Sequence, residues 1–428
     1  MAMQSVRRRF FNIVRESEKI RFLSTQQVID RESKYGSRYV TPLPLVITRA
    51  EGVFMWDMDG KRYYDYLSGL AACNQGHCHP RLVKVMREQA GKLTHASRIY
   101  YSEPTGALAE YLTKLLGWDR FLPMNTGVEG CDTAVKLARR WGYRMKKVPS
   151  GKATVVFAQG NFWGRSLAAI SASTDPNCYI DFGPYMPLFE IVPYNDTAAL
   201  ERKFQENPNI CGFMVEPIQG EGGIVVPSDG YLKRVRELCT QYNVLWIADE
   251  VLTGFGRTGT RLGIDHDGAR PDIVIVGKSL SGGMLPVSGI LADNEIMLCF
   301  DLNSHGSTFA GNALGNKIAL EAVKIVEEEN LAENAKKMGK ILREELEKMP
   351  KDIVAEIRGR GLLAGIVLNK EMKINEWDLS IKLKDAGLLT RAAQGLVKVV
   401  RIVPPLTITE EQLRESLNIL TTVLKSCK

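Results

Sequence analysis

Short apolar runs alternate with amphipathic segments along the middle of this 428-residue chain. The runs at 153–158, 212–215, 244–248 and 273–276 are too short for buried helices and are typical of strands covered on both faces. This alternation predicts an α/β fold, in which a mainly parallel sheet lies between layers of helices. The helices, which have apolar residues at helical spacing, are expected at 80–93, 131–143, 198–205 and 231–242.

The two ends of the chain have a different pattern. Residues 53–66 alternate around Asp59 and Gly60, which predicts a hairpin. Two helices are expected after Asn312, the second over 331–349 and facing solvent because it is highly charged, before strand patterns resume at 358–368 and 397–402. We therefore predict three parts: an N-terminal arm that belongs to a small domain (1–50), a large domain (51–329) and a C-terminal small α+β domain (330–428).

Composition narrows the class of protein. The chain is 45% hydrophobic and 25% charged, as in globular proteins, and no apolar run approaches a membrane span. The net charge of +7 is scattered, so we expect no nucleic-acid partner and no membrane partner. Eight cysteines without a CxxC pair indicate reduced thiols and a cytoplasmic location. The alternative is the mitochondrial matrix, because the first 21 residues are rich in arginine.

Four metal-ligand side chains gather before Pro80, namely Cys73, His77, Cys78 and His79. Their spacing is not one of the usual zinc patterns. We expect a tight loop here and no metal site.

The reactive side chains lie at the ends of two predicted strands. Lys278 follows the 273–276 run, and Asp249 ends the 244–248 run. In a parallel sheet both would meet at the edge where ligands bind. A lysine that forms an imine and an acid that keeps a pyridine nitrogen protonated are what pyridoxal phosphate requires. A lysine that points into solvent, or a structural salt bridge, is the alternative.

Further segments suit the rest of such a cofactor. Gly127 and Val128 precede the predicted helix at 131–143, and the N–H groups at a helix N-terminus favour a phosphate. Ser307 and Thr308 offer two hydroxyls in a glycine-bounded loop. Near Phe162, whose ring could stack on a cofactor, Arg165 could hold a carboxylate. Ordinary helix capping, core packing and a surface ion pair are the alternatives.

Together these segments resemble the class III (ω-type) pyridoxal-phosphate-dependent aminotransferases, and within that class they are most similar to the ornithine aminotransferases. The resemblance extends from about Lys34 to Leu417. The motifs that carry it are at 74–80, 123–129, 160–165, 173–176, 215–221, 247–250, 277–283, 306–308, 311–312, 359–363 and 401–405.

The resemblance implies a fold-type I transferase whose large domain binds pyridoxal 5'-phosphate. It implies a homodimer with active sites shared between subunits. Lys278 and Asp249 would be catalytic, Lys278 by forming the imine and Asp249 by pairing with the ring nitrogen. The other cofactor-binding residues would be Phe162 and Val251 on the two ring faces, with Gly127, Val128 and, from the partner subunit, Ser307 and Thr308 at the phosphate.

The implied reaction moves the δ-amino group of ornithine to 2-oxoglutarate, which gives glutamate 5-semialdehyde and glutamate. Arg165 would hold the carboxylate distant from the reacting amine. Glu221 would pair with Arg401 and release it when a dicarboxylate arrives. The alternatives are the same chemistry on N-acetylornithine or 4-aminobutyrate, or a broad ω-aminotransferase that uses all three.

Three positions depart from the pattern of the ornithine aminotransferases. Val40 and Leu70 stand where that group usually has tyrosines in its substrate site. Leu252 stands where the class usually has a glutamine that bonds the phenolic oxygen of the cofactor. Because leucine and valine offer no hydrogen bond, we expect weaker selection for ornithine and altered cofactor binding.

Overall fold

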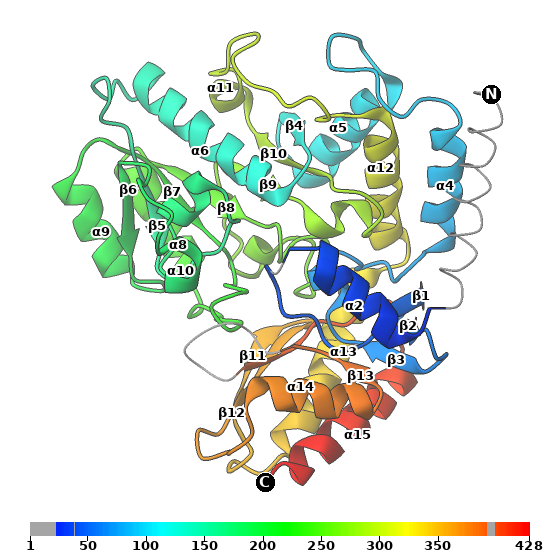
Figure 1. The fold of residues 1–428 in the computed structure, drawn as a ribbon. Helices are drawn as coiled ribbons and strands as arrows, with labels where there is room; N and C mark the ends of the chain where they lie inside the picture. The colour runs from blue at the N-terminus through cyan, green and yellow to red at the C-terminus, as the bar shows by residue number, and fades with distance from the viewer. Residues whose placement is uncertain (1–22, 38, 392–398) are drawn as a thin grey trace.

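A seven-stranded sheet forms the centre of the computed structural model, which describes residues 23–37, 39–391 and 399–428 (Figure 1). The basic first segment of the chain therefore lies outside the described residues. The strand order is β4-β10-β9-β8-β7-β5-β6, and β10 runs antiparallel to both of its neighbours while the others are parallel. The strands are β4 (Arg120–Met124), β5 (Thr154–Ala158), β6 (Phe189–Val192), β7 (Ile210–Val215), β8 (Leu245–Asp249), β9 (Ile273–Val276) and β10 (Ser288–Ala292).

Helices cover both faces of this sheet, as predicted. In β9, Ile273 and Ile275 pack with α6 on one face, whereas Val274 and Val276 belong to the core on the other face. All four are fully buried, because successive side chains of a strand point to opposite sides. One face carries α6 (Gly127–Arg144), α7 (Leu167–Ser171) and α11 (Asn294–Met297), and the core of the other includes α4 (Pro80–Ala90), α5 (Glu103–Leu116), α9 (Thr197–Glu206), α10 (Tyr231–Gln241) and α12 (Ala313–Glu328).

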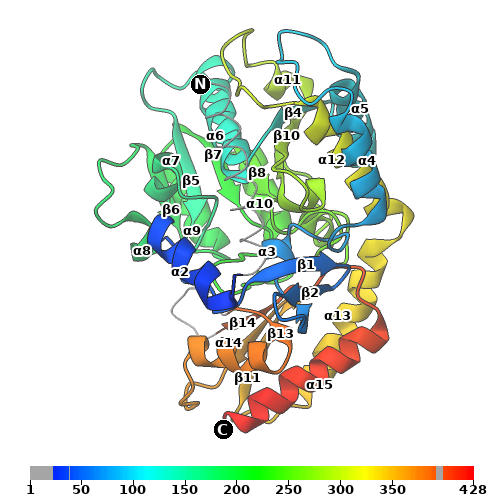
Figure 2. The ribbon, with the colours of Figure 1, turned by 45° about the vertical axis from the view of Figure 1, so that its right-hand side comes forward.

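The two ends of the chain meet in a second body, below the large sheet in Figure 1. A four-stranded sheet of order β1-β2-β3-β13 joins the N-terminal strands to a C-terminal one, and the predicted hairpin at 53–66 is its β2–β3 pair. A three-stranded sheet, β11-β12-β14, lies beside it (Figure 2). The elements are β1 (Ile47–Glu51), β2 (Phe54–Asp57), β3 (Arg62–Asp65), β11 (Val354–Arg360), β12 (Leu363–Leu368), β13 (Leu388–Leu389), β14 (Val399–Ile402), α13 (Leu331–Glu347), α14 (Glu376–Asp385) and α15 (Glu410–Ser426).

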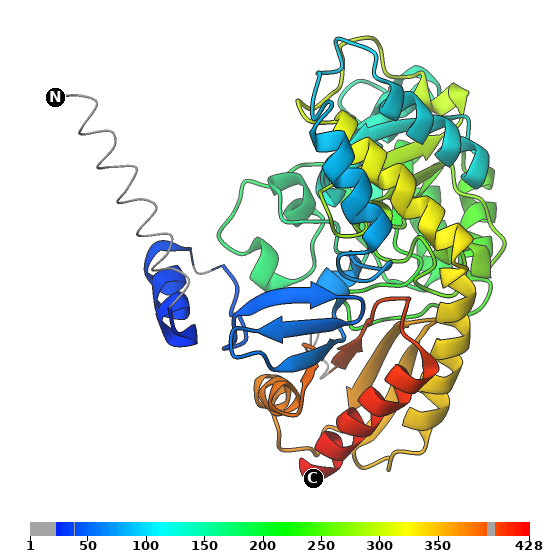
Figure 3. The ribbon, with the colours of Figure 1, turned by 90° about the vertical axis from the view of Figure 1, so that its right-hand side faces the viewer.

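The pairing of β3 with β13 bears on the domain division. We propose that the small domain includes the chain up to Asp65 as well as the segment from about Asn330 onwards, because β2 and β3 share a sheet with β13. Helix α2 (Thr25–Tyr35) has no buried residue and stands apart from both bodies (Figure 3).

Helix α13 is less exposed than its charge suggested. One face, formed by Leu331, Ala335, Met338, Leu342 and Leu346, is buried. The expectation of a solvent-facing helix was therefore wrong for that face. A charged helix of this length keeps its place by packing an apolar stripe, while its charges remain on the opposite side.

Gly339 gives a test of how closely α13 packs. A Cβ added there would lie 2.0 Å from the backbone oxygen of Gly361, so Gly339→Ala forces the helix away from the turn between β11 and β12. Overpacking of this kind costs about 1–3 kcal/mol. We expect a lower unfolding midpoint in a thermal or denaturant scan.

Gly106→Ala is the matched control, because Gly106 lies inside α5 and a Cβ there would meet nothing within 4 Å. Alanine in a helix is more stable than glycine by about 0.5–1 kcal/mol, so this midpoint should not fall. A drop of the same size in both variants would contradict the packing argument.

Candidate active site

A cavity of about 550 Å³ lies at the carboxyl ends of β7, β8 and β9, between the large sheet and the second body. Parallel strands bring the ends of these three elements to one edge, which is where open α/β sheets bind ligands. Of the residues singled out in the sequence, Ser307 and Thr308 do not line the cavity. Those that do are Val40, Leu70, Gly127, Val128, Phe162, Arg165, Glu221, Asp249, Val251, Leu252, Lys278 and Arg401.

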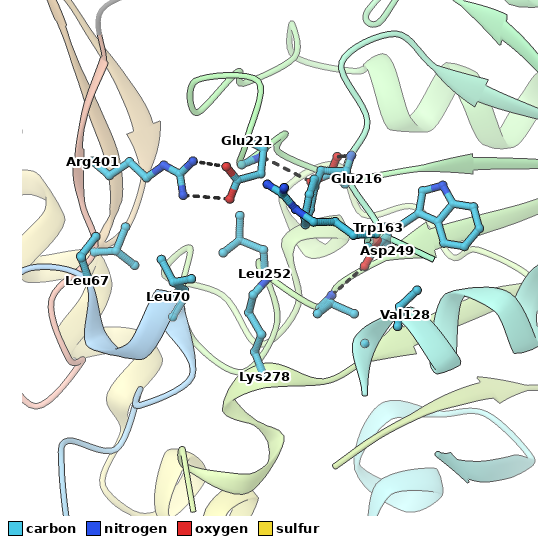
Figure 4. A pocket seen from close by; sticks show the side chains of 18 of the residues that line it. Leu67, Leu70, Val128, Trp163, Glu216, Glu221, Asp249, Leu252, Lys278 and Arg401 are labelled. Carbon is cyan, nitrogen blue, oxygen red and sulfur yellow. Dashed lines mark hydrogen bonds and ion pairs between the residues drawn. The ribbon is translucent and has the colours of Figure 1, made fainter. Parts of the chain in front are cut away.

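Lys278 occupies a strained turn directly after β9. Its φ is 42°, in the left-handed region that residues other than glycine seldom adopt, and it begins the 3₁₀ helix η2 (Lys278–Ser281). Such outliers persist only where the surrounding fold enforces them, and they concentrate at functional sites. The buried strand and the turn together direct the side chain into the cavity that Asp249 also lines (Figure 4).

Asp249 is the last residue of β8 and only 4% of it is exposed. Burial raises the pKa of its carboxyl, while the N–H of Val251 and the charge of Lys278 act in the opposite direction. That N–H donates to Oδ1 at 3.0 Å, and the Cys131 thiol donates to Oδ2 at 3.5 Å. A cation against Oδ2 would complete the stabilisation of this buried charge.

Sequence reasoning missed Cys131. It faces the same cavity one helical turn after Gly127, so the i, i+4 spacing on α6 could have identified it.

Sequence reasoning also missed Glu216, which follows β7 as directly as Asp249 ends β8. Its carboxylate accepts the N–H of Phe162 at 3.1 Å and the N–H of Gly220 at 3.3 Å. Burial, and then the charge of Asp249, raise the pKa of Glu216 to about 8. The side chain thus connects the loop of Phe162 to the loop of Glu221. The position of Glu216, an acid directly after an apolar strand, could have identified it from the sequence.

The second acid at the end of β8 has a structural role. Glu250 is fully buried and accepts hydrogen bonds from Thr253, Gly263 and Ile264. It therefore anchors the following loop, which includes η1 (Gly263–His266), and leaves the cavity to Asp249.

The first turn of α6 has free donors at the cavity. The backbone N–H groups of Gly127 and Val128 make no hydrogen bond within the described parts of the chain. Gly164 packs so closely here that a Cβ would lie 2.4 Å from Val128. Two unpaired N–H groups at a helix N-terminus suit a phosphate.

The Ser307–Thr308 loop lies next to this helix start within one chain. Ser307 Oγ donates to Glu129 at 3.1 Å and accepts from Asn125 at 2.9 Å. Thr308 is exposed. The binding of a partner's phosphate by this loop stays a prediction.

Arg401 and Glu221 form a two-pronged ion pair across the cavity (Figure 4). One of its bonds, from Nη1 to Oε1, is 2.9 Å long, and the arginine side chain is only 12% exposed. Arg165 also lines the cavity and is exposed, with its guanidinium carbon 5.8 Å from the centre of the Phe162 ring. Arg391 also lines the cavity, so its described lining includes three arginines, of which Arg401 already holds a carboxylate.

The cysteines and histidines before Pro80 have ordinary structural contacts. His77 pairs with Asp65 at 2.7 Å, and His79 caps α4 and lies 3.2 Å from Glu329.

Comparison with known proteins decides the family. The model of "Aminotransferase class-III" matches residues 35–424. The chain belongs to the class-III aminotransferases. It is 54% identical over 396 residues to the mitochondrial ornithine aminotransferase of Drosophila melanogaster, which covers 92% of this chain and 91% of that protein.

Solved structures agree. The ornithine aminotransferase of Toxoplasma gondii has a TM-score of 0.94 at 39% identity, with 97% of each chain covered, and contains pyridoxal phosphate at partial occupancy. The acetylornithine aminotransferase of Elizabethkingia anophelis has a TM-score of 0.86 at 42% identity, covering 94% of this chain and all of that one. The predicted family, α/β fold and transferase class are confirmed.

Class-III aminotransferases depend on pyridoxal phosphate, and this cavity fits it. Gly127 and Val128 have unpaired N–H groups for the phosphate, the buried carboxylate of Asp249 has room for a protonated ring nitrogen, and the amine of Lys278 faces the same cavity. We propose these three contacts, together with Phe162 on one ring face and Val251 on the other.

Lys278→Ala tests the lysine. The variant should bind pyridoxal phosphate only non-covalently, because the other contacts remain but no amine is left to form the imine. We expect loss of the visible absorbance of lysine-bound cofactor, and release of the cofactor on gel filtration in denaturant. Lys336→Ala, on the exposed face of α13, is the control and should keep the absorbance and retain the cofactor as the wild type does. Covalent retention in Lys278→Ala would assign the cofactor to another lysine.

Proposed function

We propose that the protein transfers the δ-amino group of ornithine to 2-oxoglutarate and produces glutamate 5-semialdehyde and glutamate. The single observation that carries this proposal is the Arg401–Glu221 ion pair inside a cavity that also contains Lys278, Asp249 and Arg165. The names of relatives such as the Drosophila melanogaster enzyme support the choice of substrate.

The ion pair addresses a conflict between the two substrates. Ornithine must present its δ-amine, so a free Arg401 beside the reacting atoms would instead hold its α-carboxylate and misplace it. With Glu221 paired to Arg401, we assign that carboxylate to Arg165, beside Phe162. The dicarboxylate needs both arginines and displaces Glu221. One cavity thereby distinguishes two ligands by the state of one ion pair.

Pyridoxal phosphate supplies an aldehyde that captures the amine and a ring that takes up electrons from the neighbouring carbon. The residues of the chain do the rest. Asp249 would keep the ring nitrogen of the bound cofactor protonated, and Cys131 and the N–H of Val251 orient its carboxylate. With the cofactor bound, the amine of Lys278 would remove the proton from the carbon that carries the amino group and return it on the cofactor side. Glu216 accepts the N–H of Phe162 and so holds the residue whose ring would contact one face of the cofactor.

A broader substrate range is the second candidate. The wall of the cavity is apolar at Val40, Leu70 and Leu252, and Leu252 packs in a cluster with Ile224 and Leu363. Such a wall leaves no polar group unpaired when a substrate lacks the α-amine or carries an acyl group on it. The structural similarity to an acetylornithine aminotransferase supports this candidate.

Half-reactions followed separately decide between the two candidates. We expect ornithine, N-acetylornithine and 4-aminobutyrate all to convert the cofactor of the wild-type protein, with ornithine fastest. Val40→Tyr should improve the preference for ornithine over 4-aminobutyrate by up to about tenfold, the value of one hydrogen bond. Val40→Phe, which adds the ring without the hydroxyl, is the matched control. If ornithine alone reacts with the wild type, the broad range is wrong; if ornithine fails, the proposed function is wrong.

We propose that the enzyme is a homodimer whose sites are shared. A face near the Ser307–Thr308 loop exposes large apolar side chains, among them Tyr101 at 100%, Leu302 at 94% and Phe309 at 60%. Exposed apolar surface of this kind is typical of a protein interface. It supports a second subunit here, with the exposed Thr308 directed to the phosphate of that subunit's site.

Mixed dimers test the sharing. A dimer that combines a Lys278→Ala subunit with a Thr308→Ala subunit should contain one site with both lesions and one intact site. We expect about half the activity per dimer of the wild type. Activity well below this, close to that of the two parent variants, would place the threonine in its own subunit's site.

For the location, none of the described helices is long and apolar enough to cross a membrane. The relatives named as mitochondrial support the matrix, the alternative to the cytoplasm that the sequence suggested.

A further inference from the structure

We propose that Arg358 is the second binding partner of Glu221, to which this carboxylate moves when a dicarboxylate takes Arg401. This inference rests on the proposed function, since it concerns how the ion pair of that site opens. It makes Arg358 a specificity-determining residue, although it lies outside the cavity that contains Lys278.

The strand register places the two arginines in one row. Arg358 of β11 is opposite Gly365 of β12, and Gly365 is opposite Arg401 of β14. Directly opposed residues point to the same face of a sheet, and neighbouring strands are about 4.8 Å apart, so the two arginine Cα atoms are separated by roughly 10 Å. Between them Gly365 has no side chain.

The loop that carries Glu221 lies over this row. A Cβ on Gly365 would be 3.0 Å from Ile224, the third residue after Glu221. Arg358 already contacts the loop, because its Nη1 donates to the backbone oxygen of Gly223 at 3.5 Å. Arg401 therefore binds the side chain of Glu221, and Arg358 contacts the backbone of the same loop.

Glu221 also borders the space in which Arg358 lies. A second cavity, of about 1030 Å³, adjoins the first, and both are lined by Phe162 and Glu221. Arg358 lines only the second. Glycines flank Glu221, and Gly223 has a φ of 101°, a conformation that glycine adopts freely. The side chain therefore has space on the Arg358 side and a backbone that permits the turn.

Arg358 has donors to spare. Its Nε and Nη2 donate to Glu356 at 2.9 and 2.8 Å, and Nη1 reaches Gly223. These contacts use three of the five N–H groups of a guanidinium, which leaves two for another carboxylate. The Glu356 charge weakens the attraction for Glu221, and this explains why Arg401 is preferred when no dicarboxylate is bound.

A second partner is needed because the move is otherwise unfavourable. When Glu221 leaves the largely buried Arg401, it loses a charge-assisted, two-pronged contact. The binding energy of the incoming ligand must offset this loss. Arg165 holds the other carboxylate of the ligand in the proposed function. Arg391 also lines the first cavity, but Arg358 is the arginine that already contacts the backbone of the Glu221 loop. Arg358 thus lowers the cost of opening Arg401 and raises the affinity for dicarboxylates alone.

The test uses glutarate, an inert dicarboxylate, titrated into the holoenzyme by calorimetry. Arg358→Gln should weaken glutarate binding by about five- to tenfold, within the usual range of coupling between sites. Arg358→Lys keeps the charge and should stay within about twofold of the wild type. Glu356→Gln should tighten binding, because it frees Arg358. Arg360→Gln is the matched control. Arg360 lines the second cavity, as Arg358 does, but pairs with Asp229, so its loss should leave the affinity for glutarate unchanged.

A double-mutant comparison isolates Glu221. In Glu221→Gln, no carboxylate has to leave Arg401, so adding Arg358→Gln should have no further effect on glutarate. An equal loss in that background would show that Arg358 acts on the ligand itself. An unchanged affinity in Arg358→Gln alone would also overturn the proposal.

Kinetics distinguish this inference from the proposed function. Holoenzyme loaded with pyridoxamine phosphate reacts with 2-oxoglutarate without any amino donor, and Arg358→Gln should slow that half-reaction at low 2-oxoglutarate. The ornithine half-reaction should remain within about twofold. If ornithine fails as a donor in the wild type while the glutarate results hold, only the substrate assignment is wrong.

Discussion

The structure depends on one fully buried guanidinium. Arg257 donates to the backbone oxygens of Leu362 at 3.0 Å and Pro404 at 2.6 Å, and to Asn74 at 2.6 Å and Ser68 at 3.3 Å. Burial lowers its pKa to about 9. These acceptors come from the N-terminal part and from the second body, whereas Arg257 follows β8 of the large sheet. Losing the guanidinium would leave several buried acceptors unpaired.

The geometry of the active site depends on the contact between the large sheet and the second body, where Arg257 lies. Lys278 and Asp249 belong to the large sheet, while Arg401 belongs to β14 of the second body. Their distances across the cavity are set by how the two bodies dock, and Arg257 is hydrogen-bonded at the docking surface. The ion pair between Glu221 and Arg401 crosses the same boundary. Specificity therefore depends on packing as much as on the reactive side chains.

Burial of charge explains why these side chains are held so firmly. Asp249 and Glu216 are nearly inaccessible, and burial raises the pKa of both. Each accepts hydrogen bonds from backbone N–H groups, because buried carboxyl oxygens without donors would raise the free energy of the folded state. Those N–H groups belong to the loops that carry Phe162, Val251 and Gly220. The same hydrogen bonds therefore satisfy the buried carboxyl oxygens and position the loops.

The sequence by itself determined four strands of the sheet, β5, β7, β8 and β9, most of the long helices around it and the two strand-end residues, whereas β4, β6 and the antiparallel β10 came only from the structure. The run Ile273–Val276, too short for a helix and without polar positions, could only be a strand covered on both faces, so Lys278 had to appear at its end. Only the tertiary structure decided the contact of Cys131 with Asp249, the burial of Arg257 and the row of Arg358, Gly365 and Arg401. These depend on strand register and docking between residues far apart in the chain, which no local periodicity specifies.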